Sequence, residues 1–350
     1  MEKQQSADVV IITALEKERD AVLRYLDAPK KVQTKNRIVY KSNLRHDNAE
    51  SAYQVVLLCQ NKMGNVAASI ATTQAIDVWN PSLIILVGIT AGVKNKNERY
   101  LGDLVAAEQI VGYESGKLTD AGAERRYDVL RSTHTIVEAA RNFPDDKWVL
   151  APTIPRPDGK DGRVIPKIHW GIVASGEKVI ADTKTAPELQ NHWAKLAGIE
   201  MEAYGTALAA YTAESRPEFL MVKGICDWAN PDKNDEWQEY AADVAAVYVV
   251  NLLKNKIFIS TPDRHQTEIK ILHHYSGKIK IQLCRKLGLD WQDVADYFDI
   301  PPHRRNQFHQ GRECQAIWEW LEERNKLYSL KEALDFLERD NLVKLLNADT

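Results

Sequence analysis

A short apolar stretch that ends in two carboxylates constrains the fold most. Residues 196–199 are apolar, Glu200 and Glu202 flank a methionine, and an alanine-rich run follows at residues 203–210. This change from strand to helix pattern predicts an α/β fold with the two acids at the carboxyl end of a strand. Open α/β sheets bind their ligands at that edge.

A further acid follows the next apolar run. Residues 219–225 predict another buried strand, which delivers Asp227 to the same edge, so Glu202 and Asp227 are expected to lie close together. Acids at the start of a helix also suit its macrodipole, which accounts for Glu200 or Glu202 alone. It does not account for an acid after a different strand. The combination therefore favours a functional carboxylate pair.

These residues carry a family resemblance. Glu200-Met201-Glu202-Ala203, followed by Lys223-Gly224-Ile225-Cys226-Asp227, resembles the paired signature of the nucleoside phosphorylase and nucleosidase superfamily, most closely the methylthioadenosine/S-adenosylhomocysteine nucleosidases. The resemblance covers roughly residues 8 to 255 and implies a mixed central sheet flanked by helices. It also implies that Glu202 holds the ribose hydroxyls and that Asp227 is the general acid at N7 of the purine. Neither a metal nor another cofactor is expected.

The first predicted βα junction supplies a third acid. Residues 8–13 predict a buried strand, and Glu18 lies on the helix that follows. By the resemblance, Glu18 matches the family's acid that positions the attacking water. A solvated helical face accounts for Glu18 equally well.

Three loops are expected to complete the site. The loop at Met63 and Gly64 resembles the family's glycine-containing loop, where a missing side chain lets the backbone approach a ligand. Residues 83–88 predict a strand that ends in a small-residue turn at the ligand edge, and residues 175–180 resemble the family segment that stacks on the purine, without its aromatic ring. The residues expected to bind substrate here are Met63, Gly64, Thr90, Ala91, Gly92, Lys178, Val179, Ile180, Glu200 and Met201, with Met63, Met201, Val179 and Ile180 as apolar walls.

Two features of the sequence bear on whether the protein uses or binds phosphate. In the phosphorylase branch an arginine near the end of the strand at 83–88 clamps phosphate, whereas Leu86 and Val87 stand here, which favours hydrolysis by water. A basic stretch predicted to be an exposed loop follows residue 112, and an ordinary solvated loop is the alternative. The cations considered for binding phosphate groups of a substrate are Lys117, Arg125, Arg126, Lys178 and Lys223.

A chain of 350 residues is long enough for two domains. The predicted division is a catalytic domain at 1–258, a linker at 259–267 and an all-helical domain at 268–350. The helical segment resembles a death-like or effector-associated adaptor domain, with an unrelated oligomerisation bundle as the alternative. From residue 264 on it has 14 acidic and 14 basic residues, which favours a protein partner over DNA. Its expected helices span 280–287, 291–298, 316–324 and 331–337, with Leu287, Trp291, Val294, Trp318 and Leu321 as core and Arg304, Arg305, Glu322 and Glu323 as charges for an interface.

Composition gives no reason to expect nucleic-acid or membrane binding. The net charge is −3, and Cys59, Cys226, Cys284 and Cys314 lack the paired spacing of a zinc site. No apolar run approaches the roughly 20 residues of a membrane span. A cytoplasmic protein with reduced thiols is expected.

Three functions remain open at this point. The first is an effector that hydrolyses the N-glycosidic bond of purine nucleosides or nucleotides, because the run from Pro231 to Tyr240 resembles a sub-branch fused to signalling modules in bacterial defence systems, whose members cleave purine nucleotides, ATP among them. The second is a housekeeping nucleosidase or phosphorylase, and the third a non-catalytic nucleotide sensor. A homo-oligomer is expected, while the base, the number of phosphates and the activating partner stay open.

Overall fold

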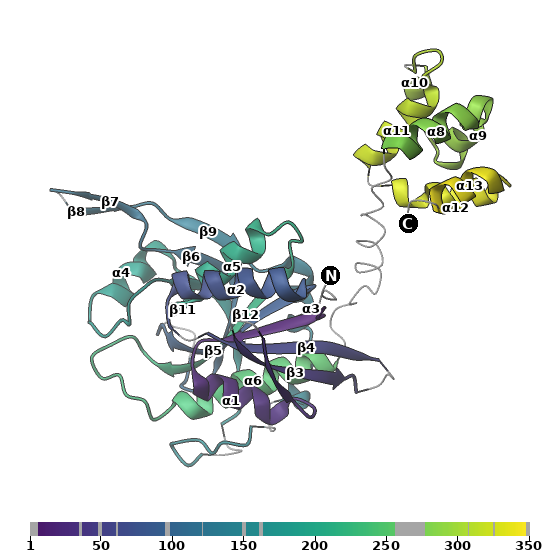
Figure 1. The fold of residues 1–350 in the computed structure, drawn as a ribbon. Helices are drawn as coiled ribbons and strands as arrows, with labels where there is room; N and C mark the ends of the chain where they lie inside the picture. The colour runs from purple at the N-terminus through teal and green to yellow at the C-terminus, as the bar shows by residue number, and fades with distance from the viewer. Residues whose placement is uncertain are drawn as a thin grey trace. The chain divides into compact units, whose positions relative to one another are not determined.

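The computed structural model divides into two compact units, residues 1–260 and 261–350, here the N-terminal and C-terminal units (Figure 1). The predicted linker at 259–267 and the boundaries at 258 and 268 lie outside the described residues and stay predictions. Described are residues 6–34, 37–47, 51–60, 62–94, 99–120, 122–148, 152–160, 164–255, 277–306, 308–324 and 326–347.

A mixed sheet forms the centre of the N-terminal unit, as the family resemblance implies. Its strand order is β11-β10-β6-β12-β5-β1-β4-β3-β2, with β9 beside β6. An additional pairing of β11 with β5 joins β5, β12, β6, β10 and β11 into a closed ring. The strands are β1 (Val9–Thr13), β2 (Lys30–Gln33), β3 (Ile38–Arg45), β4 (Ala52–Cys59), β5 (Leu83–Gly92), β6 (Leu104–Gly112), β9 (Asp128–Arg131), β10 (Ile168–Ser175), β11 (Leu196–Glu200) and β12 (Glu218–Asp227).

Helices cover both faces of this sheet (Figure 1). Because successive side chains of a strand point to opposite faces, Val9 and Ile11 of β1 join one core cluster while Val10 and Ile12 join the other. The first cluster packs against α1, α3 and α6, the second against α2 and α5. The helices are α1 (Glu16–Tyr25), α2 (Asn65–Trp79), α3 (His134–Arg141), α4 (Thr185–His192), α5 (Ala203–Thr212) and α6 (Gln238–Lys254).

The expectation of an exposed basic loop after residue 112 is wrong. The segment forms a hairpin of β7 (Gly116–Thr119) and β8 (Gly122–Arg125), which pair with each other. The two strands form a sheet of their own, apart from the central sheet. A hairpin that covers no core shows no alternation of apolar residues, so the sequence pattern of a loop and of such a hairpin is the same.

The C-terminal unit is helical, as predicted. Leu287, Val294, Trp318 and Leu321 are buried in its core, and Trp291 packs against them partly exposed. Two helices, α10 and α13, were not predicted. The helices are α8 (Gly277–Leu287), α9 (Trp291–Tyr297), α10 (Pro302–Arg305), α11 (Glu313–Glu323), α12 (Leu330–Phe336) and α13 (Asp340–Asn347).

Two of the charges considered for an interface, Arg305 and Glu322, make contacts inside the unit. The guanidinium of Arg305 donates to the backbone carbonyls of Ile300 and Ala295, so this side chain fastens α10 to α9 inside the unit. Glu322 likewise accepts from the indole N–H of Trp318 at 2.7 Å. Arg304 stays a prediction.

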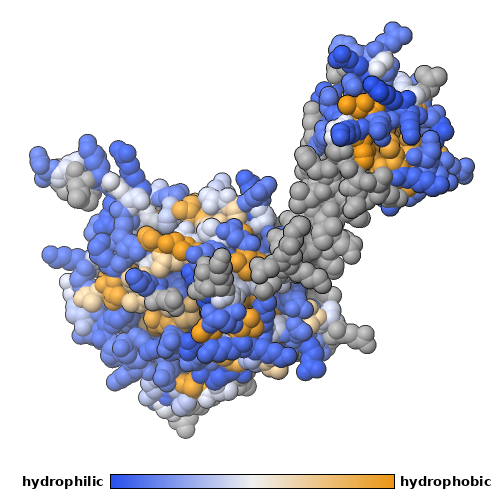
Figure 2. Space-filling model, viewed as in Figure 1, coloured by the Kyte–Doolittle hydropathy of each residue, from blue (hydrophilic) through white to orange (hydrophobic). Residues whose placement is uncertain are grey.

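The surface viewed in Figure 2 is mostly hydrophilic, with hydrophobic side chains gathered at several places on the N-terminal unit. On α2, three apolar side chains are exposed: Val66 at 68%, Ile70 at 52% and Val78 at 40%. Within the described parts of the chain, no helix offers an apolar stretch long enough to cross a bilayer.

The close approach of α2 and α5 gives a stability test. In Gly205→Ala, the new Cβ would lie 2.0 Å from the backbone oxygen of Asn65. Alanine favours a helix by up to about 1 kcal/mol over glycine, but overpacking costs about 1–3 kcal/mol, and we expect net destabilisation in urea unfolding. The control is Tyr211→Ala on the same helix, whose 63% exposed side chain should change stability by less than about 0.5 kcal/mol. A stabilised Gly205→Ala variant would contradict the packing.

Candidate active site

One cavity gathers most of the predicted site residues. It lies where β1, β5, β11 and β12 end, and its empty space, together with open solvent at the mouth, is about 640 Å³. We call it the carboxylate cavity. Eleven of the sixteen predicted residues line it: Glu18, Met63, Thr90, Ala91, Lys178, Val179, Ile180, Glu200, Met201, Glu202 and Asp227.

The end of β5 brings the acids together. Ala91 pairs with Ile199 of β11 on one side and with Asp227 of β12 on the other. Glu202 and Asp227 therefore lie at one cavity where two strands end, as expected, although β11 runs antiparallel to β5 while β12 runs parallel to it. Closure of the sheet through β5, rather than a shared strand direction, makes the acids neighbours.

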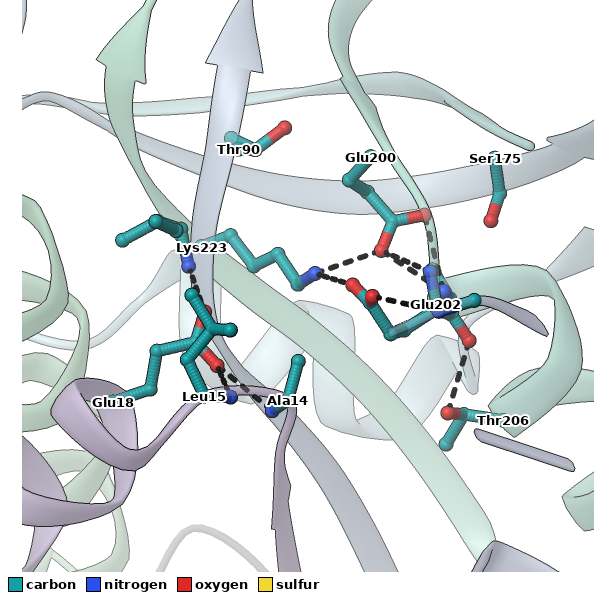
Figure 3. Close-up of polar contacts among 12 residues, drawn as sticks. Ala14, Leu15, Glu18, Thr90, Ser175, Glu200, Glu202, Thr206 and Lys223 are labelled. Atoms are coloured by element: carbon teal, nitrogen blue, oxygen red, sulfur yellow. Dashed lines mark hydrogen bonds and ion pairs between the residues drawn. The ribbon is translucent and has the colours of Figure 1, made fainter. Parts of the chain in front are cut away.

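A buried ammonium group links the two glutamates (Figure 3). The Nζ of Lys223 donates to Glu200 Oε2 at 2.8 Å and to Glu202 Oε2 at 2.7 Å, and its side chain is 1% exposed. Burial disfavours the ammonium, yet the two carboxylates outweigh burial and raise the pKa of Lys223. Lys223 is thus occupied inside the protein, and its assignment as a phosphate ligand is wrong.

The two glutamates differ in their remaining bonds. Glu200 accepts from the backbone N–H groups of Glu202 and Ala203 at 2.9 Å, so it caps the start of α5. Glu202 accepts from the backbone N–H of Gly64 at 3.2 Å. Glu200 is therefore engaged in holding the turn, while Glu202 lies at the cavity wall with fewer bonds of this kind.

Glu18 is not on a solvated face, so that alternative is wrong. It is 2% exposed and accepts from the backbone N–H groups of Ala14, Leu15 and Ile89, each at 2.8 Å. Burial raises the pKa of Glu18, and the charge of Lys223 opposes this rise. Gly88 makes room for it, because a Cβ there would lie 2.2 Å from Glu18 Oε1.

Asp227 has a cationic partner that the sequence did not point to. Its Oδ2 accepts from Lys233 Nζ at 2.8 Å, and its Oδ1 accepts from the N–H of Ala229 at 2.9 Å. Lys233 lines the carboxylate cavity, as do Cys226 and Gln238. A single lysine in a polar loop shows no periodicity, and only its place soon after Asp227 could have marked it.

Five predicted residues do not line the carboxylate cavity. Gly64 contributes its backbone N–H to Glu202 and has φ +108°, which favours glycine. Gly92 has no room for a Cβ, which would meet Ile225 and Trp228. Lys117, Arg125 and Arg126 lie on or beside the β7–β8 hairpin, and Arg125 pairs with Glu188 at 2.9 Å.

The cavity offers carboxylates and apolar walls. Met63, Met201, Val179 and Ile180 all line it, as predicted for the walls around a base and a sugar. Among the described residues, no group of three or more His, Cys, Asp or Glu could hold a metal ion. The arrangement can hold hydroxyl groups, donate or accept protons and stabilise positive charge.

The fold matches that of known nucleosidases. The solved structure of 5′-methylthioadenosine/S-adenosylhomocysteine nucleosidase from Neisseria meningitidis, in complex with methylthio-immucillin-A, aligns with a TM-score of 0.55 and 20% identity. The match covers 70% of this chain and 98% of that one. At this identity the likeness concerns the fold.

Sequence comparison assigns the family. Residues 8–254 match the family described as Phosphorylase superfamily, and residues 277–349 match Bacterial Death-like domain 3. The chain belongs to the phosphorylase superfamily and carries a C-terminal bacterial death-like domain.

Relatives include proteins of different length. The 5′-methylthioadenosine/S-adenosylhomocysteine nucleosidase of Shewanella loihica is 26% identical over 212 residues, 57% of this chain and 81% of that protein. The ATP nucleosidase Cap17 of Escherichia coli is 26% identical over 204 residues, 55% of this chain and 40% of Cap17. The chain also spans 50% of the length of y4jS, an uncharacterized protein of Sinorhizobium fredii, with 29% identity over 209 residues.

Removing the buried ammonium should destabilise the protein in a pH-dependent way. Lys223→Met leaves Glu200 and Glu202 buried without their cation, which typically costs about 3–5 kcal/mol. In the variant, Glu200 and Glu202 repel each other without the cation between them, and the repulsion is full only where both are charged, so folding stability falls as pH rises. We therefore expect a larger loss in urea unfolding at about pH 8 than at about pH 5.

The matched control is Lys254→Met. Lys254 pairs with Asp27 at 3.6 Å, and both side chains are partly exposed. Such pairs contribute about 0–1 kcal/mol. The role given to the buried ammonium would be contradicted if both variants lost the same folding stability. It would also be contradicted if the loss of stability in Lys223→Met did not change with pH.

Proposed function

We propose that the protein hydrolyses the N-glycosidic bond of purine nucleosides or nucleotides, ATP among them, and releases the base. The observation that carries this proposal is the convergence of three buried carboxylates, Glu18, Glu202 and Asp227, on one cavity with apolar walls. The relatives named as nucleosidases support the reaction class, and Cap17 supports a nucleotide as substrate.

The three carboxylates suit the charges of this reaction. As the bond between C1′ and the purine nitrogen N9 breaks, its electron pair moves into the base and positive charge develops on the ribose. Asp227 is the proposed general acid that gives a proton to N7, and Lys233 stabilises the carboxylate that remains. Glu202 holds the ribose hydroxyls and stabilises the cationic sugar, while Glu18 accepts a proton from the water that adds to C1′.

Water rather than phosphate is the proposed nucleophile. Leu86 and Val87, in the neighbourhood where phosphorylases hold an arginine, are 0% and 1% exposed in the core of β5. Lys223 is bound by two glutamates and is not available to an anion. The carboxylates of the cavity would repel a phosphate ion placed beside C1′.

The cellular role proposed is that of an effector in a bacterial defence or signalling system. A death-like domain that follows a nucleotide-cleaving domain suits recruitment by a protein partner, and the likeness to Cap17 supports the same role. Action on a nucleotide pool would take place in the cytoplasm. A homo-oligomer is also proposed, supported by the exposed Val66, Ile70 and Val78 of α2.

Replacement of the acid should abolish base release and leave the fold intact. Asp227→Asn cannot donate the proton that Asp227 gives to N7, and loss of a general acid costs about 10² to 10⁴ in rate. The assay measures free base from ATP, adenosine and methylthioadenosine, with and without inorganic phosphate, beside thermal unfolding of both proteins. Unchanged turnover in Asp227→Asn would remove the proposed acid, and ribose 1-phosphate as the main product would defeat hydrolysis.

The C-terminal unit should be dispensable for the chemistry. A chain ending at residue 255 keeps every residue that lines the carboxylate cavity. Its kcat/KM for base release should stay within about twofold of the full-length value, while activity in cells that depends on a partner should be lost. If truncation abolishes base release by the purified protein, the C-terminal unit is part of the catalytic fold and the adaptor role fails.

A further inference from the structure

A second cavity adjoins the carboxylate cavity. It opens between the start of α1, the β2–β3 hairpin and the end of β4, and its empty space, together with open solvent at the mouth, is about 1370 Å³. The two cavities share Ala14 and Leu15 in their walls. We call the second one the basic cavity, because Arg19, Lys31 and Arg37 all line it.

We infer that the basic cavity binds the 5′-phosphate groups of a nucleotide whose base and ribose occupy the carboxylate cavity. This inference rests on the proposed function and names its substrate class. In this arrangement the base lies at Asp227 and the ribose hydroxyls lie at Glu202. The remaining substituent of the ribose, its 5′ carbon, then points past Ala14 and Leu15. A chain of phosphates attached there enters the basic cavity.

The cations of the basic cavity are unequally engaged. Arg19 donates to Asp20 at 2.8 Å and to Glu16 at 3.3 Å, so its charge is largely balanced. Arg37 donates through Nε to the neutral amide of Gln74 at 2.9 Å, and in the described part of the chain it has no carboxylate within ion-pair distance. The guanidinium of Arg37 can therefore bind phosphate oxygens, and its planar donors suit them.

Burial acts against the charge of Arg37, and no described carboxylate forms an ion pair with it. Partial burial lowers the pKa of Arg37, whereas acidic partners raise the pKa of Arg19. An anion in the basic cavity would supply the missing partner. Lys31, exposed on β2, adds a second cation to the same wall.

A buried amide gives an independent indication of a polar ligand. Gln60 lines the basic cavity and is only 2% exposed, yet neither its amide nitrogen nor its amide oxygen has a hydrogen-bond partner among the described residues. Buried polar side chains in native proteins are nearly always hydrogen-bonded. A phosphate oxygen that accepts from Nε2 of Gln60 would satisfy the donor.

The cations that the sequence suggested as phosphate ligands are less suited to bind phosphate. Arg125 is paired with Glu188, and Lys178 is paired with Glu114 at 2.6 Å. Lys223 is fully engaged by Glu200 and Glu202. The basic cavity instead offers Arg37 without an acidic partner and an amide without any partner, in the part of the chain that the structure describes.

The test compares substrates with and without phosphates in full-length protein. Because a bond to a charged group is strong, Arg37→Ala should lower kcat/KM for ATP by about tenfold or more, and Lys31→Ala should lower it less. Adenosine does not reach the basic cavity, so its kcat/KM should stay within about twofold of wild type in both variants, which also shows that they fold. A variant that loses activity equally toward ATP and adenosine would overturn the inference.

Matched controls lie on β3, which begins just after Arg37, and on β2, which contains Lys31. Arg45→Ala removes an arginine from the other end of β3, where its side chain is 82% exposed. Lys30→Ala removes the neighbour of Lys31 on β2, whose side chain points to the opposite face. Neither residue lines the basic cavity, and neither variant should change the ratio of ATP to adenosine cleavage.

Direct binding separates this inference from the proposed function. Calorimetry with inorganic triphosphate as the probe should detect binding to wild type and to Glu202→Gln, and a loss of at least about tenfold in affinity in Arg37→Ala. Absence of triphosphate binding to wild type would overturn the basic cavity as a phosphate site, even if adenosine is cleaved. Cleavage of neither nucleosides nor nucleotides would instead defeat the proposed function, while triphosphate binding that depends on Arg37 would still support the site.

Discussion

The ammonium of Lys223 is the group on which the site depends. The carboxylates of Glu200 and Glu202 would repel each other in the core without a cation, and Lys223 contacts both from β12, which lies on the other side of β5 from β11. One ammonium against two carboxylates still leaves the centre of the site negative, and Glu18 adds to this when it is ionised. A negative centre favours a ribose that develops positive charge and disfavours an anionic nucleophile. The same interaction thus accounts for the stability of the turn and, in the proposed reaction, would favour water over phosphate as the nucleophile.

The sequence predicted the carboxylates better than the cations. Glu202 and Asp227 each follow an apolar strand, and acids in that position stand out from the periodic pattern. Glu18 did not stand out in the sequence, because an acid on the first turn of a helix gives the same pattern whether it faces solvent or a cavity. Lys223 lies inside an apolar run, and such a run predicts only that the strand is buried. The two acidic partners of Lys223 lie outside this strand, so the run gives no sign of them. Lys233 and Arg37 lie in polar surroundings that offer no contrast.

For the fold as well, the sequence predicted some features and not others. The strands predicted over residues 8–13, 83–88, 196–199 and 219–225 from their apolar residues are present as β1, β5, β11 and β12, whereas β2 and β9 were not predicted. What the pattern could not supply is which strand pairs with which. The contact of Ala91 with both Ile199 and Asp227 depends on the curvature of the whole sheet, and so does the neighbourhood of the acids. The β7–β8 hairpin was missed for the opposite reason, since it covers no core and needs no apolar periodicity.

The separation of charges between the two cavities bears on how such a protein could select its substrate. A nucleotide carries negative charge at one end and develops positive charge at C1′ during cleavage, so no single electrostatic environment suits both ends. Here the carboxylates line the cavity proposed for the sugar, and Arg19, Lys31 and Arg37 line the adjoining space beyond Ala14 and Leu15. An uncharged nucleoside would gain from the first environment alone, whereas a nucleotide would gain from both. Because interactions with remote phosphates can position C1′ against water and acid, the basic cavity would act on the rate of cleavage as well as on binding.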